Sequence, residues 1–251
     1  MDFEKFITKV KKPSRYINGE WNSRHFTDSG QKIRLCLAYP DMYELGASGL
    51  GLEILYHIVN SRSDAVAERA YAPDFDLQEL LKNEKIPFFS LESRSPLKEF
   101  DVIGFSLEYE LTYTNVLNML SLSGIPLDSS LRGEEFPLII GGGPCCVNPE
   151  PVAQFFDLFV LGEGEEVIRE IIEALKNCRQ KNLNKQKTLE ELALIEGVYL
   201  PSFYTVDYNS DGRVVNVQSS RGCAKNQVAR RTVDLKNSFF PTGQIVSYAQ
   251  R

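Results

Sequence analysis

The sequence has no excess of positive charge. Its 28 lysine and arginine residues are outnumbered by 34 aspartate and glutamate residues, which gives a formal net charge of −6. Proteins that bind nucleic acid or anionic membranes by electrostatic attraction need a basic surface. We therefore expect neither nucleic acid nor a membrane among the partners of this chain.

Long apolar runs are also absent. No stretch approaches the roughly 20 apolar residues that span a bilayer. The charged start "MDFEKFITKVKK" has no apolar segment of the kind found in secretory signals. These absences predict a cytoplasmic protein.

Cysteine and histidine are few and follow no metal-site or disulfide pattern. The five cysteines are an odd number at irregular spacing, and no pair is spaced as in a zinc knuckle. His25 and His57 have no partners at metal-ligand spacing, so we expect reduced thiols and no metal site. Cys145 and Cys146 follow three glycines, where they form either a reactive pair at a helix start or small buried loop residues.

What the sequence does contain is an alternation of strand and helix patterns. Residues 33–39, "IRLCLAY", form a continuous apolar run that is typical of a buried parallel strand. Leu50, Ile54, Leu55 and Ile58 then share one face of an expected helix. A helix therefore follows the first strand directly.

The same alternation continues along the chain. Further strands are expected in "VAERAYAP", "PFFS", "FDVIGFSLE", "FPLIIGGG" and "DLFVLGEGE", with helices in "FDLQELLKN", "LTYTNVLNMLSLSG" and "EEVIREIIEALKN". Strands that alternate with helices imply βαβ units and a parallel sheet covered on both faces. We predict a doubly wound, Rossmann-like α/β domain over residues 31–178.

The rest of the chain is expected to form smaller parts. Residues 1–30 are an N-terminal segment, and the basic stretch 176–187 indicates an exposed helix end and linker. Residues 179–218 are predicted to hold this linker and a small β-hairpin module that turns at residues 209–212. Residues 219–251 show no apolar periodicity and are predicted to be an extended tail.

Polar residues and glycines follow four of the expected strands. Ligands of doubly wound sheets bind beyond the carboxyl ends of the strands, so these residues are the candidates for contact with a ligand. Glycines there let a ligand approach the backbone, and the helix N-termini that follow offer N–H groups to an anion. The four sequences are Asp41-x-Tyr43-x-x-Gly46, Ser106-Leu107, Gly141-Gly142-Gly143 and Gly162-Glu163-Gly164-Glu165.

A dinucleotide is the first ligand to consider at such a sheet. The first loop, however, reads Gly46-x-x-Gly49-x-Gly51, which is not the G-x-G-x-x-G that a pyrophosphate requires, and the sequence has no P-loop lysine. A free-standing dinucleotide enzyme is therefore the weakest functional hypothesis.

The four loops resemble those of another group of proteins. The cobalamin-binding domains of methionine synthases and mutases carry Asp-x-His-x-x-Gly after the first strand, Ser-x-Leu after a later one and Gly-Gly after the next. The Gly-Glu-Gly-Glu sequence is similar to one found in cobalamin-binding domains that precede radical S-adenosylmethionine (SAM) modules. The cofactor-binding residues that this resemblance implies are Asp41, Tyr43, Gly46, Ser106, Gly141, Gly142, Glu163 and Glu165.

Longer stretches resemble the N-terminal region of one family of large radical SAM proteins. They include "GEWNS", "YPDMYELGASGLGLEILYHIVN", "GGGPCCVNPEPVAQFFDLFVLGEGEEVI" and "FPTGQIV", and the resemblance covers about residues 13–251. It implies a domain that holds a corrin, or that docks a catalytic barrel present in the same chain or in another.

Two departures from these patterns limit what the resemblance implies. Tyr43 stands where the cobalamin proteins have the histidine that binds cobalt, and a phenol with a pKa near ~10 would first have to ionise. We therefore expect no cobalt ligand from this protein. In the second motif, Ser106-Leu107-Glu108 differs from Ser-x-Leu, which weakens its match to the cofactor's tail site.

The motif for the catalytic cluster is also missing. Radical SAM enzymes hold a [4Fe–4S] cluster on Cys-x-x-x-Cys-x-x-Cys. Here "RGCAKNQVAR" begins like that loop at Cys223, but Gln227 and Arg230 stand at the second and third positions. The resemblance thus assigns the cluster, SAM and every catalytic residue to a module further on, towards which residues 219–251 would lead.

Two hypotheses remain open from the sequence. In the first, the domain holds a corrin or docks the catalytic module. In the second, it is a non-enzymatic interaction module that has lost its cofactor, and its basic segment 221–236 contacts a partner. An open pocket above the sheet would favour the first hypothesis, and bulky residues filling that space would favour the second.

Overall fold

The apolar runs of the sequence become the strands of one main sheet. The computed structural model describes residues 3–24, 30, 32–234, 236 and 238–246. The described residues form a six-stranded sheet, whose strands in spatial order are β2 (Ala65–Tyr71), β1 (Ile33–Tyr39), β3 (Val102–Ser106), β4 (Leu138–Gly142), β5 (Leu158–Val160) and β6 (Val198–Tyr199). The first five are parallel, and β6 runs antiparallel to β5.

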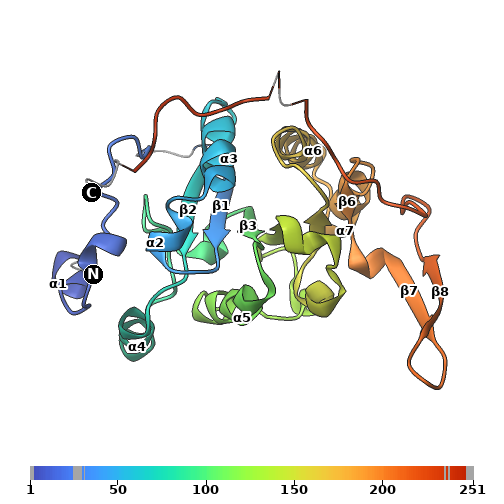
Figure 1. Ribbon diagram of the computed structural model, residues 1–251, viewed down its shortest axis with the longest axis horizontal. Coiled ribbons are helices and arrows are strands. Elements are labelled where there is room, and N and C mark those ends of the chain that lie inside the picture. Colours follow the sequence, from blue (N-terminus) through green and yellow to red (C-terminus); the bar gives the residue numbers. More distant parts are fainter. Residues whose placement is uncertain (1–2, 25–29, 31, 235, 237, 247–251) are drawn as a thin grey trace.

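Helices cover both faces of this sheet, as Figure 1 shows. Each face has its own apolar core. On one face lie α3 (Leu50–Asn60), α6 (Val167–Gln180) and α7 (Lys185–Leu192), and on the other lie α1 (Phe3–Ile7), α4 (Phe75–Glu84) and α5 (Tyr113–Leu122). The predicted doubly wound α/β fold is therefore confirmed.

Short helical turns complete the connections. A four-residue helix, α2 (Tyr43–Gly46), follows β1. The 3-10 turns are Pro13–Arg15, Leu97–Glu99, Glu110–Thr112, Ser129–Leu131, Pro144–Val147, Glu150–Phe155 and Pro201–Phe203. Within the described residues, no helix is long and apolar enough to cross a bilayer.

One local prediction is wrong, and another is right only in part. "PFFS" forms no strand, because the backbone N–H of Ser90 donates to the carbonyl of Ser95 and the segment closes into a loop beside β2. Residues 176–187 contain the predicted helix end, since α6 continues to Gln180, but the connection after it is only four residues long because α7 begins at Lys185. The Asn184 side chain caps α7 by accepting a hydrogen bond from the N–H of Lys187 at 2.9 Å.

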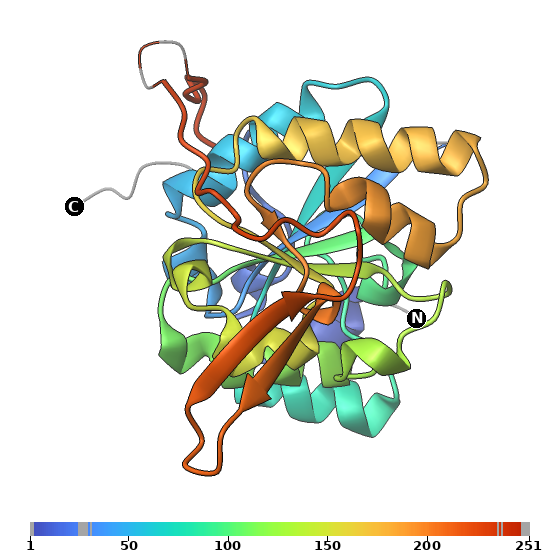
Figure 2. The same ribbon diagram turned by 90° about the vertical axis from the view of Figure 1, so that its right-hand side faces the viewer.

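The predicted hairpin is present in the C-terminal part. Strands β7 (Tyr204–Tyr208) and β8 (Val214–Ser219) pair antiparallel around the turn at residues 209–212. Figure 1 shows the hairpin projecting from the β6 side of the molecule, and Figure 2 turns this side towards the viewer. The domain limits expected at residues 178 and 218 stay predictions, although β6 joins the main sheet beyond the first of them.

The tail is extended, as expected, but it packs against the domain. Its described part passes α6 and α3 and returns towards the N-terminal segment (Figure 1). Arg231 makes an isolated parallel bridge with Gly162, and Ile245 is only 3% exposed and belongs to the apolar core on the α3 and α6 face of the sheet. The tail is therefore held at two separate points.

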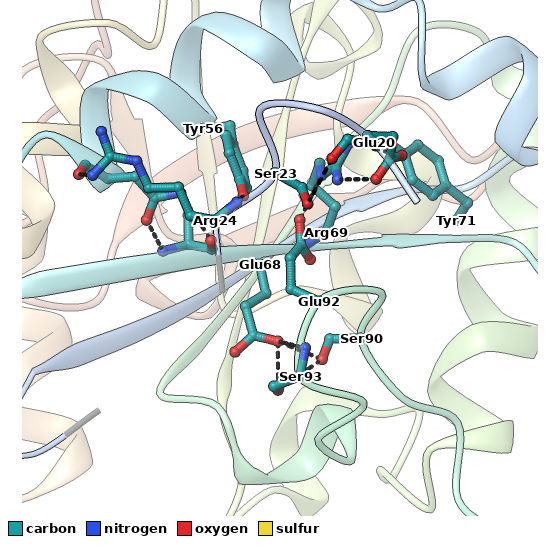
Figure 3. A network of polar contacts seen from close by, with 12 residues as sticks. Glu20, Ser23, Arg24, Tyr56, Glu68, Arg69, Tyr71, Ser90, Glu92 and Ser93 are labelled. Atoms are coloured by element: carbon teal, nitrogen blue, oxygen red, sulfur yellow. Dashed lines mark hydrogen bonds and ion pairs between the residues drawn. The ribbon is translucent and has the colours of Figure 1, made fainter. Parts of the chain in front are cut away.

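A buried charged cluster joins the N-terminal segment to the edge strand β2 (Figure 3). The Arg69 side chain, 1% exposed, donates from Nε to Glu92 Oε1 at 2.6 Å and from Nη2 to Glu20 Oε2 at 3.0 Å. The neighbouring Glu68 points to the opposite face of the strand. There its Oε2 accepts hydrogen bonds from Ser90 and Ser93.

Candidate functional site

A cavity of about 260 Å³ lies at the carboxyl edge of the sheet. It is enclosed by α3, α6 and the ends of β1, β3, β4 and β5, which includes the β1/β3 position where the strand order reverses. This is where doubly wound sheets bind their ligands. The apolar walls include Leu37, Leu52, Leu55, Ile140, Val160 and Ile168, and the polar residues are Ser106, Glu108, Glu163 and Glu165.

The two glycines that end β4 have different roles. A Cβ atom on Gly142 would meet nothing within 4 Å, so this position faces open space in the cavity. A Cβ on Gly141 would lie 2.5 Å from Cδ1 of Phe159. Successive residues of a strand point to opposite faces. Of the predicted pair, only Gly142 lines the cavity, whereas Gly141 permits close packing behind it.

The loops after β3 and β4 are joined through the backbone. The N–H of Leu107 donates to the carbonyl of Gly142 at 2.6 Å, and the N–H of Cys145 donates to the carbonyl of Leu107 at 3.1 Å. Gly143 has a φ of +105°, and a Cβ there would lie 2.8 Å from the Leu107 carbonyl oxygen. These bonds hold Ser106, which lines the cavity, at the junction of two strands.

Asp41 connects the loop after β1 to the loop after β3. Its Oδ2 accepts a hydrogen bond from the Tyr109 hydroxyl at 2.8 Å, and its Oδ1 accepts one from the N–H of Met42 at 2.7 Å. The Asn115 side chain also donates to the carbonyl of Pro40 at 2.9 Å. Asp41 therefore shapes the edge of the site without lining the cavity.

Tyr43 turns away from the cavity. Its hydroxyl donates to Glu20 Oε1 at 2.8 Å, and its ring meets the ring of Tyr71 edge-on, with centroids 5.2 Å apart. Burial raises the pKa of Tyr43 well above its ordinary value, and the contact with Glu20 raises it further. The phenol therefore stays protonated and is unsuited to bind cobalt. Gly46, at the end of the same turn, is also outside the cavity lining.

The acidic loop after β5 forms one wall of the cavity. Both Glu163 and Glu165 line it. The Glu163 carboxylate accepts a hydrogen bond from the N–H of Val233 at 2.5 Å, and Arg230 lies 3.8 Å from its other oxygen. Glu165 forms no ion pair with any residue that the structure describes. The two glutamates, both predicted as cofactor-binding residues, thus differ in their availability to a ligand.

The charge of the cavity opposes anionic ligands. Among the described residues that line it are three glutamates and no lysine, arginine or histidine. A phosphate group inside would face carboxylates without a compensating cation. This composition agrees with the absence of a dinucleotide motif from the sequence.

Exposed apolar side chains occupy the loops at the carboxyl edge. They follow β1, β3 and β4, and their exposed fractions lie between 39% and 83%. The set is Met42, Leu45, Leu50, Leu111 and Val147. Four of them carry no signal in the sequence beyond their place after an expected strand. Leu50, expected on the shared apolar face of its helix, is the first residue of α3 and is 61% exposed. Exposed apolar residues gathered at one edge are typical of a surface that another group covers.

The two adjacent thiols are buried. Burial raises the pKa of Cys146 to about 12, and it also raises the pKa of Cys145. Of the two interpretations, buried loop residues therefore fit better than a reactive pair. Within the described part of the chain, no group of three or more histidine, cysteine, aspartate or glutamate residues is placed to hold a metal ion.

Comparison with known families identifies the region. Residues 51–201, more than half of the chain, match the family described as "Radical SAM proteins, N-terminal". The chain belongs to this radical SAM N-terminal family. The matched residues 51–201 include α3 beyond its first residue, α6, β3, β4 and β5, which enclose the cavity together with β1.

Similar proteins are considerably longer than this radical SAM N-terminal chain. An uncharacterized protein of Methanocaldococcus jannaschii is 23% identical over 202 residues, which cover 76% of this chain and 39% of that protein. The chain therefore spans about two fifths of the length of the curated relative it matches.

Two solved structures also resemble the chain. One is the cobalamin-dependent S-adenosylmethionine radical enzyme OxsB with aqua-cobalamin and S-adenosylmethionine bound, at 17% identity and a TM-score of 0.48 over 86% of this chain and 24% of that one. The other is the methyltransferase TsrM from Kitasatospora setae with cobalamin and a [4Fe–4S] cluster bound, at 14% identity and a TM-score of 0.43 over 77% and 32%.

Proposed function

We propose that this domain binds a corrinoid at the carboxyl edge of its sheet, with the base of the cofactor's nucleotide tail in the cavity. The observation that carries the proposal is the open apolar cavity beside Gly142. At about 260 Å³ it is smaller than the roughly 300–1,000 Å³ of pockets that hold whole drug-sized ligands, so it suits one ring system of a larger molecule. The benzimidazole of cobalamin is an uncharged aromatic ring system of this kind. Only this base would enter the cavity, and the phosphate that links it to the corrin would lie outside the acidic lining.

Different residues of the cavity would contact different parts of the corrinoid. Gly142 leaves the space that the base occupies, and the leucine and isoleucine walls contact its apolar faces. Ser106 and Glu165, at polar points of the lining, can accept hydrogen bonds from amide N–H groups, which are abundant on the corrin. When bound, the corrin would supply its cobalt centre to the catalytic module of the parent protein.

This protein would offer a bound corrin no histidine nitrogen at position 43. Tyr43, at the position of the usual histidine, holds its hydroxyl against Glu20 and its pKa is raised. The role we assign to Asp41 is structural, because its carboxylate is already bonded to Tyr109. The corrin would therefore be held by its tail and its amides.

The exposed apolar residues support docking of a further module. Leu111 and Val147 are 83% and 75% exposed on loops of the same edge. A corrin lying on this edge, with a radical SAM catalytic module above it, would cover them. Bulky residues filling the cavity would have favoured the alternative hypothesis of a module that lost its cofactor, and the open space beside Gly142 argues against it.

The proposal is tested with hydroxocobalamin and the purified chain. We expect the wild-type chain to bind it, as measured by equilibrium dialysis, and Gly142→Leu to abolish binding because the new side chain fills the cavity. Gly222→Leu is the matched control, since a Cβ at Gly222 also meets nothing within 4 Å but lies in the tail.

A second variant tests the role of the tyrosine. Tyr43→Phe should change the affinity by less than tenfold, or about 1.4 kcal/mol, because the hydroxyl bonds to Glu20 and not to the ligand. The bound spectrum should show no histidine ligation in either protein. The proposal is wrong if the wild-type chain binds no hydroxocobalamin under conditions where a known cobalamin domain does.

A further inference from the structure

A short piece of the tail is built into the edge of the site. We call residues 230–233 the strap. The backbone N–H of Arg231 donates to the carbonyl of Leu161 at 2.8 Å, and its carbonyl accepts from the N–H of Glu163 at 3.2 Å. These two bonds form a parallel bridge beside Gly162, so the strap extends the hydrogen bonding of the sheet past the end of β5.

The side chain of Arg231 anchors the strap. It is 14% exposed and lies among three carboxylates. Its Nη2 is 2.8 Å from Glu170 and 3.0 Å from Glu166, both near the start of α6, and its Nη1 is 3.7 Å from Glu196. A guanidinium that serves several carboxylates at once is a stronger anchor than an isolated surface ion pair.

Two glycines make room for the strap. Gly162 has a φ of +103°, and a Cβ there would lie 2.1 Å from the carbonyl oxygen of Arg231. Gly197 has a φ of +82°, and a Cβ there would lie 2.5 Å from Cγ of Arg231. Both positions combine a backbone conformation that favours glycine with a close approach of the strap. The loop after β5 and the turn before β6 are thus both shaped around the same arginine.

The loop that receives the strap also lines the cavity. Gly162, Glu163 and Glu165 all face the cavity, and the N–H of Val233 donates to the Glu163 carboxylate at 2.5 Å. A displacement of the strap would release this carboxylate and remove the backbone bonds that hold the wall. The position of one cavity wall therefore depends on a segment about 70 residues further along the chain.

We propose that Arg231 is a positioning residue of the binding site, because it holds the strap against residues 161–166 and so fixes this wall of the cavity. We further propose that binding of the strap to this wall and binding of a ligand in the cavity stabilise each other. Such coupling is reciprocal, so a ligand in the cavity should hold the strap in place as much as the strap favours the ligand. The coupling half of this inference rests on the proposed function, whereas the fixing of the wall does not.

Hydrogen exchange of the full chain, followed by mass spectrometry, tests the fixing of the wall. Arg231→Ala should accelerate amide exchange in residues 161–166 by at least about tenfold while β1 and β3 keep their protection, which shows that the domain stays folded. Arg221→Ala is the matched control, because Arg221 lies in the same tail but its nearest carboxylate is Glu190 at 3.8 Å. Unchanged exchange in residues 161–166 of Arg231→Ala would overturn the proposal.

Added hydroxocobalamin tests the coupling. It should slow exchange in residues 229–234 of the wild-type chain, and Arg231→Ala should bind it at least about fivefold more weakly, the lower end of typical coupling between sites. Arg231→Lys should lie between the two proteins, since it keeps the charge but not the two-nitrogen geometry. Equal affinity in wild type and Arg231→Ala would refute the coupling. If the wild type binds no corrinoid, the proposed function fails, and the exchange of residues 161–166 alone decides whether the strap fixes the wall.

Discussion

At the scale of single residues, Gly46 lies between two tyrosine rings. A Cβ there would be 2.6 Å from Cδ1 of Tyr71 and 2.7 Å from Cδ1 of Tyr39. The sequence resemblance associates this glycine with a cofactor loop, yet packing alone is enough to require it. Tyr43 is similar, because its hydroxyl and ring are fully engaged with Glu20 and Tyr71.

A pair of variants separates packing from backbone effects. Gly46→Ala should lower the free energy of unfolding by about 1–3 kcal/mol, the usual cost of overpacking. Gly51→Ala should raise it by about 0.5–1 kcal/mol, because Gly51 is in helix α3 with nothing within 4 Å of its absent Cβ. Urea unfolding measures both, and equal stability of the two variants would contradict the packing explanation.

At the scale of elements, Asp64 joins the turn between α3 and β2 to helix α6. Its carboxylate accepts hydrogen bonds from Arg62 at 2.8 Å and from Lys176 at 2.9 Å. The bond from Arg62, followed by that from Lys176, lowers the pKa of Asp64 from 3.8 to about 2. A lowered pKa in the folded state stabilises the protein above the unfolded pKa, and this stabilisation is lost as the pH falls through the folded pKa.

The sign of this effect gives a pH-dependent prediction. Asp64→Asn should lower the free energy of unfolding at pH 7 by about 0.5–1 kcal/mol, because the pairs are partly exposed and screened by solvent. The difference from wild type should shrink as the pH falls from about 4 to about 2. Urea unfolding at several pH values measures it, with Glu79→Gln on the exposed face of α4 as control. A difference that stays constant down to pH 2 would exclude Asp64 as its source.

The elements also show where sequence reasoning succeeds. The runs at residues 33–39 and 102–106 became buried strands because a parallel sheet covered on both faces needs continuous apolar stretches. "PFFS" is also largely apolar, but its backbone bonds go to Leu122, Leu97 and Ser95, which no local pattern reveals. Helix α7 was missed because only two of its residues, Leu189 and Leu192, are buried.

The site could be predicted only in part, because contacts between distant parts of the chain leave no local pattern in the sequence. The positions of Ser106 and Gly142 at the ends of their strands were enough to bring them to the cavity. The direction of Tyr43 depends on Glu20 in the N-terminal segment, a contact across 23 residues that no motif records. Arg231 was missed because its partners lie in two other parts of the chain, residues 161–170 and residues 196–197. The glycines at 162 and 197 that admit it look like ordinary turn residues in the sequence.

At the scale of the whole molecule, the sequence contains no three-cysteine motif for a catalytic cluster. Gln227 and Arg230 occupy the positions where the second and third cysteines of the cluster motif would follow Cys223. After anaerobic reconstitution with iron and sulfide, the purified chain should remain colourless and free of iron. A radical SAM module treated in parallel is the control, and about one brown [4Fe–4S] cluster per chain would contradict the prediction.

The two borders of the main sheet affect how the molecule behaves at high concentration. At one edge, in β2, the backbone N–H of Arg69 donates to the Glu92 carboxylate at 2.7 Å. The carbonyl of Arg69 accepts a hydrogen bond from the N–H of Leu91, also at 2.7 Å. On the other, β6 has only two residues and runs against the direction of its neighbour. Edge strands with unpaired backbone groups are templates for aggregation between molecules, and a short or covered edge strand prevents such aggregation. The main sheet therefore offers little opportunity for strand-to-strand association between molecules.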